Sequence, residues 1–379
     1  MKSTTGEHFV ALDQIRAVAA FMVFAWHFTH ADQGTPLPFE GAPWFVPLTL
    51  VDEGHTGVSL FMTLSGYLFA KLLNGRTVDY GPFLWNRFLR LAPLLGLVII
   101  LAGVQRSVQG LPMMPYAQSV LQGIVAPSLP NGGWSITVEA HFYFLLPLIL
   151  WLSRRWAPWL IICLLGAVMV RALLYARFGE VQSVSCWTII GRIDQFLIGI
   201  FLFQCRVCFV KRHLLAVVVA ALFIVFHWSF NAAGGYYGTS KSPIWIVLPT
   251  IEGMACGLLI AYYDGSFSLQ NKGFSRVLGL IGTYSYSIYL LHVFVVFDLA
   301  AVIDERVMKL SNIYSATIWA IICFGLMVPV GYLSARYIEA PFLRLRKSYT
   351  GAAAATSRPD ALTSASATPS PHPAVWRPQ

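Results

Sequence analysis

The chain has 379 residues, of which 57% are hydrophobic and only 11% are charged, with a net charge of +9. Soluble domains carry about 25% charged residues, so this composition excludes an ordinary soluble enzyme and indicates a chain surrounded largely by lipid. A basic balance also suits nucleic acid, but the basic residues here lie in short loops between apolar runs, as in membrane proteins. We therefore expect a lipid bilayer as partner and no nucleic acid.

Apolar runs of spanning length recur along the chain and predict an all-α polytopic integral membrane helical bundle of about ten transmembrane helices. The predicted spans are residues 9–29, 57–73, 91–105, 134–152, 156–175, 187–203, 214–230, 244–263, 277–299 and 313–333. The interval 109–131 contains four prolines and is expected to be a loop or an interfacial segment.

Lysine and arginine concentrate in alternate loops, which by the positive-inside rule predicts that both termini are cytoplasmic. From about residue 349 onward the composition changes to Ala, Ser, Thr and Pro. Such a segment cannot bury enough apolar surface to fold. We therefore expect a transmembrane domain over residues 9–348 and a disordered cytoplasmic tail over residues 349–379.

The first apolar run carries Arg16 near one end and His27 near the other. In a helix, eleven residues give about 16 Å of rise and place the two side chains on one face, roughly 20° apart. Each polar group inside a membrane costs on the order of 2–3 kcal/mol. Two of them aligned on one face therefore indicate a functional role, although an anchoring arginine and a core histidine are the structural alternatives.

Seven short motifs follow one another in a fixed order. They are Asp13 and Arg16 followed by His27; residues 57–67 (GVSLFMTLSGY); Arg87 and Arg90 before Pro93; residues 134–143 with Glu139; Arg192, Asp194 and Gly199; residues 285–292 (SYSIYLLH); and Glu339 before Pro341. Together they resemble the acyltransferase-3 family of polytopic membrane O-acyltransferases over residues 12–345.

This resemblance implies transfer of an acyl group, usually acetyl, from cytoplasmic acetyl-CoA or another acyl-CoA to a hydroxyl of a sugar or glycan. The acyl-CoA would be a co-substrate, with no permanently bound cofactor and no metal. The implied location is the bacterial cytoplasmic (inner) membrane. Direct transfer and an acyl-enzyme intermediate both remain open.

Residue roles follow from the chemistry of this reaction. His27 is expected to be the general base, because an imidazole can withdraw the proton of a sugar hydroxyl near neutral pH. Arg16 would contact CoA or the thioester carbonyl. Arg87 and Arg90 would bind the CoA phosphates, since arginine forks suit phosphate oxygens. Their alternative role is to determine topology.

Four acidic and basic residues in later spans are less specific. Glu139 is a catalytic candidate that would orient a histidine or hold acceptor hydroxyls, or else pair with an arginine. Arg192 and Asp194 are expected to stabilise each other or to cap a helix, and Glu252 needs a buried partner, an arginine or an acceptor hydroxyl. The alternative function is a transporter of an anionic solute, with Arg16, Arg192 and Glu252 lining its path.

Overall fold

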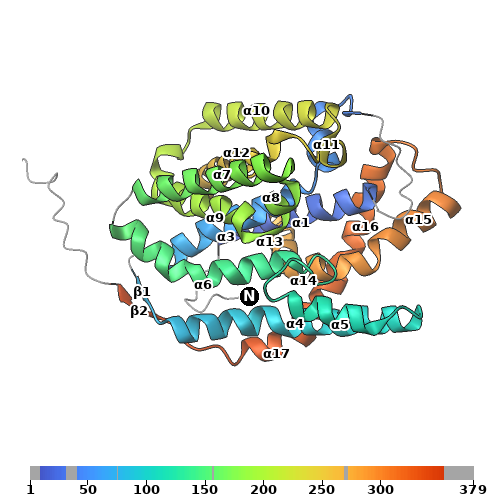
Figure 1. Ribbon diagram of the computed structural model, residues 1–379, viewed down its shortest axis with the longest axis horizontal. Helices are drawn as coiled ribbons and strands as arrows, with labels where there is room; N and C mark the ends of the chain where they lie inside the picture. Colours follow the sequence, from blue (N-terminus) through green and yellow to red (C-terminus); the bar gives the residue numbers. More distant parts are fainter. Residues whose placement is uncertain (1–8, 31–40, 75, 156–157, 269–271, 354–379) are drawn as a thin grey trace, which may run out of the picture.

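The computed structural model describes residues 9–30, 41–74, 76–155, 158–268 and 272–353, and the described chain is a bundle of helices with one small two-stranded sheet (Figure 1). The long helices are α1 (Val10–Thr29), α3 (Thr56–Leu72), α4 (Tyr80–Val108), α6 (Trp134–Arg155), α7 (Pro158–Phe178), α9 (Ile189–Gln204), α10 (His213–Ala232), α12 (Leu248–Ser266) and α16 (Ile313–Ser334). The shorter helices are α2 (Thr49–Asp52), α5 (Met113–Gln122), α8 (Gln182–Trp187), α11 (Gly235–Gly238), α13 (Gly273–Thr283), α14 (Ser285–Leu291), α15 (Val296–Arg306) and α17 (Ala340–Leu343). The all-α prediction is therefore confirmed.

Six helices in the described part are long and apolar enough to cross a membrane, and a bent pair would make a seventh. The six are α1, α4, α6, α7, α10 and the α16–α17 segment. The predicted spans at 57–73, 187–203 and 244–263 coincide with α3, α9 and α12, which are helical but are not among the six. The count of about ten crossings and the orientation of the termini stay predictions.

The centre of the bundle is formed by α3 and α9, which touch through glycines. A Cβ on Gly66 would lie 2.1 Å from the Phe196 carbonyl oxygen, and one on Gly199 would lie 2.1 Å from that of Thr63. Such close approach between helices requires small residues at the contact. Figure 1 shows α10 at one edge of the bundle and α4, α5 and α17 at the opposite edge, with α3 and α9 between them.

Two predicted spans differ from the observed helices. The span predicted at 277–299 is broken, because α13 and α14 meet at a bend of 53° and a 3-10 turn follows at His292–Phe294. The Tyr284 N–H bonds to the Leu280 and Ile281 carbonyls, which ends α13 in a tight turn. The span predicted at 91–105 begins instead at Tyr80, since Pro93 is accommodated inside α4.

The interval predicted to be a loop or an interfacial segment contains α5, a helix of ten residues. It packs along α4, where the Tyr116 hydroxyl donates to the Ile99 carbonyl at 2.5 Å. This contact fixes the short helix against the surface of the long one.

The chain after α17 returns along the first half of α4. Strand β2 (Thr350–Ala353) pairs antiparallel with β1 (Arg76–Val78), and Tyr349 is buried. The folded part therefore continues past the predicted boundary at residue 348, at least to Ala353. The rest of the predicted tail, residues 354–379, lies outside the described residues.

Candidate active site

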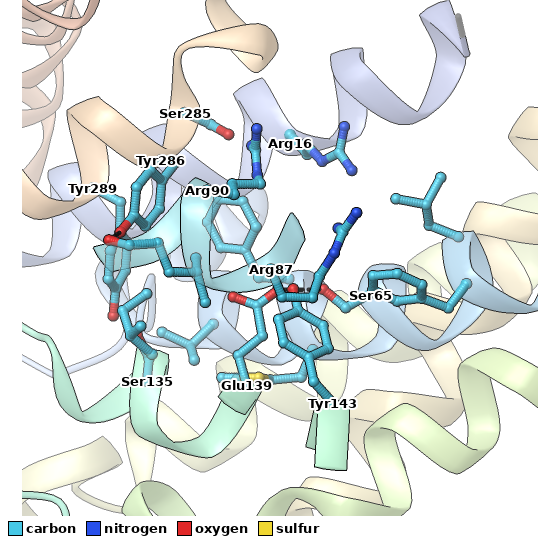
Figure 2. Close-up of a pocket in the computed structure, with 17 residues that line it drawn as sticks. Arg16, Ser65, Arg87, Arg90, Ser135, Glu139, Tyr143, Ser285, Tyr286 and Tyr289 are labelled. Atoms are coloured by element: carbon cyan, nitrogen blue, oxygen red, sulfur yellow. Dashed lines mark hydrogen bonds between the residues drawn. The ribbon is translucent and has the colours of Figure 1, made fainter. Parts of the chain in front are cut away.

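An open-sided pocket with a cavity volume of about 100 Å³ lies where α1, α3, α4, α6 and α14 meet (Figure 2). Its polar lining is Arg16 from α1, Ser65 from α3, Arg87 and Arg90 from α4, Ser135, Glu139 and Tyr143 from α6, and Ser285, Tyr286 and Tyr289 from α14. Figure 2 shows the three guanidinium groups on one side of the pocket and Glu139 with Tyr143 on the other.

The three arginines predicted to bind the acyl donor converge on this pocket. Arg87 and Arg90 are three residues apart on α4, a spacing that places them on the same face of the helix. The Arg87 guanidinium lies 5.2 Å from the centre of the Phe69 ring and 5.8 Å from that of Tyr143. Arg16 is held by Asp13, with 2.5 Å between Nη1 and Oδ1. The site is therefore cationic on one wall.

Glu139 supplies a negative charge on the opposite wall. Its Oε1 accepts hydrogen bonds from the Tyr143 hydroxyl and, at 3.4 Å, from the Ser65 hydroxyl. The structure thus brings Glu139 together with Arg16, Arg87 and Arg90. A carboxylate facing three cations can orient neutral hydroxyl groups and limits the excess positive charge of the pocket.

His27 is not among the residues that line this pocket. It lies about three turns farther along α1, where its Nδ1 is 2.9 Å from the Val23 carbonyl oxygen and 3.3 Å from Nε2 of His292. Nδ1 of His292 is 2.6 Å from the Tyr289 carbonyl oxygen and donates to it, so in the neutral imidazole Nε2 is the acceptor. Both neighbours of His27 Nδ1 therefore accept, which leaves the basic lone pair of a neutral His27 on Nε2.

One residue joins the pocket to the histidine pair. Tyr289 lines the pocket, and its ring centre lies 6.0 Å from that of His292. The His292 ring centre is in turn 5.0 Å from that of His27. The cationic pocket and the predicted base are thus two ends of one chain of contacts among the described residues, and His27 does not itself line the pocket.

A second polar cluster is buried between α3, α9, α10 and α12, with Glu252 at its centre. Glu252 accepts from the Ser59 hydroxyl at 2.5 Å and lies 3.7 Å from Arg192 and from His227. The predicted need for a buried partner is confirmed. His55 also approaches this carboxylate, at 4.0 Å. Several of these buried polar atoms, including Oε1 of Glu252 and Nε2 of His227, make no hydrogen bond within the described residues.

The predicted pairing of Arg192 with Asp194 is wrong. Asp194 instead bonds to Arg171 of α7 at 2.7 Å, with both side chains fully buried, while Arg192 donates to Ser59 at 2.7 Å. Residues two apart on a helix point to different faces, so these two cannot meet. The Asp194 ion pair ties α9 to α7, and the Arg192 hydrogen bond ties it to α3.

Several pocket residues carry no charge and were not predicted to act. They are Ser65, Ser135, Tyr143, Ser285, Tyr286 and Tyr289. All of them lie within the short motifs described above, and Tyr143 is one helical turn after Glu139, on the same face. The contact between His27 and His292 joins positions 265 residues apart, and no local pattern could have indicated it.

Comparison with known proteins assigns the chain to a family. The model of the acyltransferase-3 family, described as an acyltransferase domain, matches residues 9–336. The chain is 25% identical over 309 residues to the exopolysaccharide production protein ExoZ of Rhizobium meliloti (strain 1021), covering 77% of this chain and 90% of that protein. No solved structure matches the chain significantly. The chain belongs to the acyltransferase-3 family of multi-pass membrane proteins and is an acyltransferase for groups other than amino-acyl groups.

Proposed function

We propose that this acyltransferase moves an acetyl group from cytoplasmic acetyl-CoA to a hydroxyl of an exported polysaccharide in the bacterial inner membrane. The observation that carries the proposal is the convergence of Arg16, Arg87 and Arg90 on one pocket of an acyltransferase-3 chain. The similarity to ExoZ, an exopolysaccharide production protein, supports a polysaccharide acceptor. An acyl-CoA is anionic through its phosphates, and guanidinium groups are the side chains best suited to bind phosphate oxygens.

The distance between the cationic pocket and His27 fits a long thioester. Arg16 and His27 are separated by eleven residues of α1, which corresponds to about 16 Å. With the phosphates at the arginines, the pantetheine arm would extend past Tyr289 towards His292 and His27. The described pocket lining includes neither histidine, so the arm would leave the pocket beside Tyr289 to reach them.

The reaction itself moves the acyl group from the thioester sulfur to the acceptor oxygen, and it moves one proton from that oxygen to the sulfur. Nε2 of His27 would take the proton from the acceptor hydroxyl, and the hydroxyl oxygen would form a bond to the thioester carbonyl carbon. The carbon–sulfur bond would then break, and the departing thiolate would take up the proton held by His27, which restores the neutral base. Glu139, with Tyr143, would hold a hydroxyl or the thioester in position.

The test is transfer by the purified protein. With acetyl-CoA and the polysaccharide as substrates, His27→Ala is expected to reduce the release of free CoA and the formation of glycan ester by about 10²- to 10⁴-fold. His213→Ala, which changes an exposed histidine at the start of α10, is the matched control and should behave like the wild type. Wild-type rates in His27→Ala would refute the role of His27.

A further inference from the structure

The segment that follows α17 lies beside the arginine pocket, although it is outside the region matched by the family model. This segment, residues 344–349, is called the C-terminal strap here. It is fastened to α4 by two bonds to one side chain: Asn86 Nδ2 donates to the Lys347 carbonyl at 2.6 Å, and the Lys347 N–H donates to Asn86 Oδ1 at 2.9 Å. Both atoms of a buried amide are used to hold the strap, so its position is specific.

The strap brings Arg346 and Tyr349 to the predicted phosphate-binding residues. The Tyr349 ring centre lies 6.0 Å from the Arg87 guanidinium and 5.5 Å from the Phe83 ring centre. Burial, then the charges of Arg90 and Arg87, lower the pKa of Arg346 to about 10. Arg346 therefore stays protonated at neutral pH, and it lies in the strap next to Lys347, which is bonded to Asn86, and shortly before Tyr349, which lies against Arg87.

Two nitrogens of this cluster lack partners. Nε of Arg346 and Nε of Arg87 are both buried, and neither makes a hydrogen bond within the described residues. Partial burial of like charges with unsatisfied donors is unfavourable unless an anion compensates it. Two carboxylates lie near this cluster, Glu139 across the pocket from Arg87 and Glu339 near Arg346, and each already accepts a hydrogen bond from a hydroxyl group.

We infer that the C-terminal strap completes a phosphate-binding site, in which Arg346 joins Arg87 and Arg90 around the phosphate oxygens of the acyl donor. This inference rests on the proposed function for the identity of the donor. The same chemistry would also recognise the phosphate of an anionic lipid headgroup. In either case the bound group is an anionic phosphate, and the strap supplies one of the side chains that bind it.

The experiment measures binding without catalysis. The full-length protein in neutral detergent is titrated with CoA, with 3′-dephospho-CoA and with pantetheine, for the wild type, Arg346→Ala, Arg346→Lys and the exposed strap control Arg344→Ala. Loss of one charge-assisted contact should weaken CoA binding about 10- to 100-fold in Arg346→Ala. Arg346→Lys should retain part of the affinity, and pantetheine, which lacks the nucleotide phosphates, should bind all variants equally.

The outcomes separate this inference from the proposed function. A defect that disappears with 3′-dephospho-CoA assigns Arg346 to the 3′-phosphate, and one that persists assigns it to the pyrophosphate; both support the site. Wild-type CoA affinity in Arg346→Ala, or an equal loss for pantetheine, overturns it. If the wild type binds no CoA, the proposed donor is wrong. The site is then judged by dihexanoyl phosphatidylglycerol against dihexanoyl phosphatidylcholine, where equal binding by Arg346→Ala and Arg344→Ala overturns it.

Discussion

The imidazole of His292 lies against the imidazole of His27, with 3.3 Å between Nε2 of the former and Nδ1 of the latter. The contact joins α1 to the turn after α14, two parts of the chain that the break in the ninth predicted span allows to meet. His292 therefore helps to hold the imidazole ring of His27 in one orientation.

His292→Ala should lower kcat about tenfold and leave the KM for acyl-CoA nearly unchanged. The loss is modest because the Val23 carbonyl still accepts from Nδ1 of His27, so one of two orienting hydrogen bonds remains. His292→Gln offers an amide oxygen at a similar place and should recover part of the rate. A change in the acid limb of the pH–rate profile distinguishes orientation of His27 from a general loss of structure. A defect as large as that of His27→Ala would mean that His292 contacts the reacting atoms.

Glu139→Gln should lower kcat at least tenfold without raising the KM for acyl-CoA. The amide keeps the shape of the side chain, but it removes a negative charge that faces three arginines, and this change does not weaken binding of an anion. Steady-state kinetics with acetyl-CoA measure both constants. Tyr143→Phe serves as the comparison, because it removes the hydrogen bond to Glu139 and keeps the charge. A raised KM with an unchanged kcat would contradict this role.

Asp194→Asn should destabilise the protein by about 3–5 kcal/mol, since it leaves the fully buried Arg171 without its counter-ion. Arg171 also donates to the Ile246 and Gly191 carbonyls, so the guanidinium cannot turn out to solvent without losing these bonds. Unfolding of the purified protein by heat or by denaturing detergent reports the difference. Lys309→Ala removes an exposed ion pair at the end of α15 and should have no measurable effect. Equal stability of the two variants would argue against the buried pair as a structural link.

Gly282→Ala should abolish or severely reduce folding, because its Cβ would lie 1.6 Å from the Asp13 carbonyl oxygen. Helices α1 and α13 would have to separate, and Arg16, one turn beyond Asp13, would shift with α1. Gly279→Ala, one turn earlier on the same helix, meets only a methyl group of Val10 at 3.9 Å and should be tolerated. The yield of monodisperse protein after detergent extraction compares the two. Normal behaviour of Gly282→Ala would show that the helices can move apart at little cost.

The sequence predicted helices best where an apolar run has clear ends. Residues 9–29 were predicted and α1 covers Val10–Thr29, because the run stops at the polar segment after Thr29. The prediction was less accurate around Pro93, where the span was predicted to begin at residue 91. The helix begins eleven residues before that, at Tyr80, and its early part is bonded to the strap through Asn86.

The site was predictable in its parts but not in its arrangement. Arg16, Arg87, Arg90 and Glu139 were named from motifs, and they do line one pocket. Their distance from His27, and the contact of His27 with His292, depend on how α14 bends away from α13. Arg192 and Asp194 show the same limit, because each found a partner on a different helix. Which distant side chains meet is decided by packing, which short motifs do not encode.

The two helices at the heart of the fold are short. Helices α3 and α9 have 17 and 16 residues, which correspond to about 24–26 Å, whereas α4 has 29 residues and reaches about 43 Å. The hydrocarbon layer of a bilayer is about 30 Å thick. Both central helices are thus shorter than the hydrocarbon layer is thick. A donor bound at one end of α3 and an acceptor bound at its other end would be separated by about 26 Å at most.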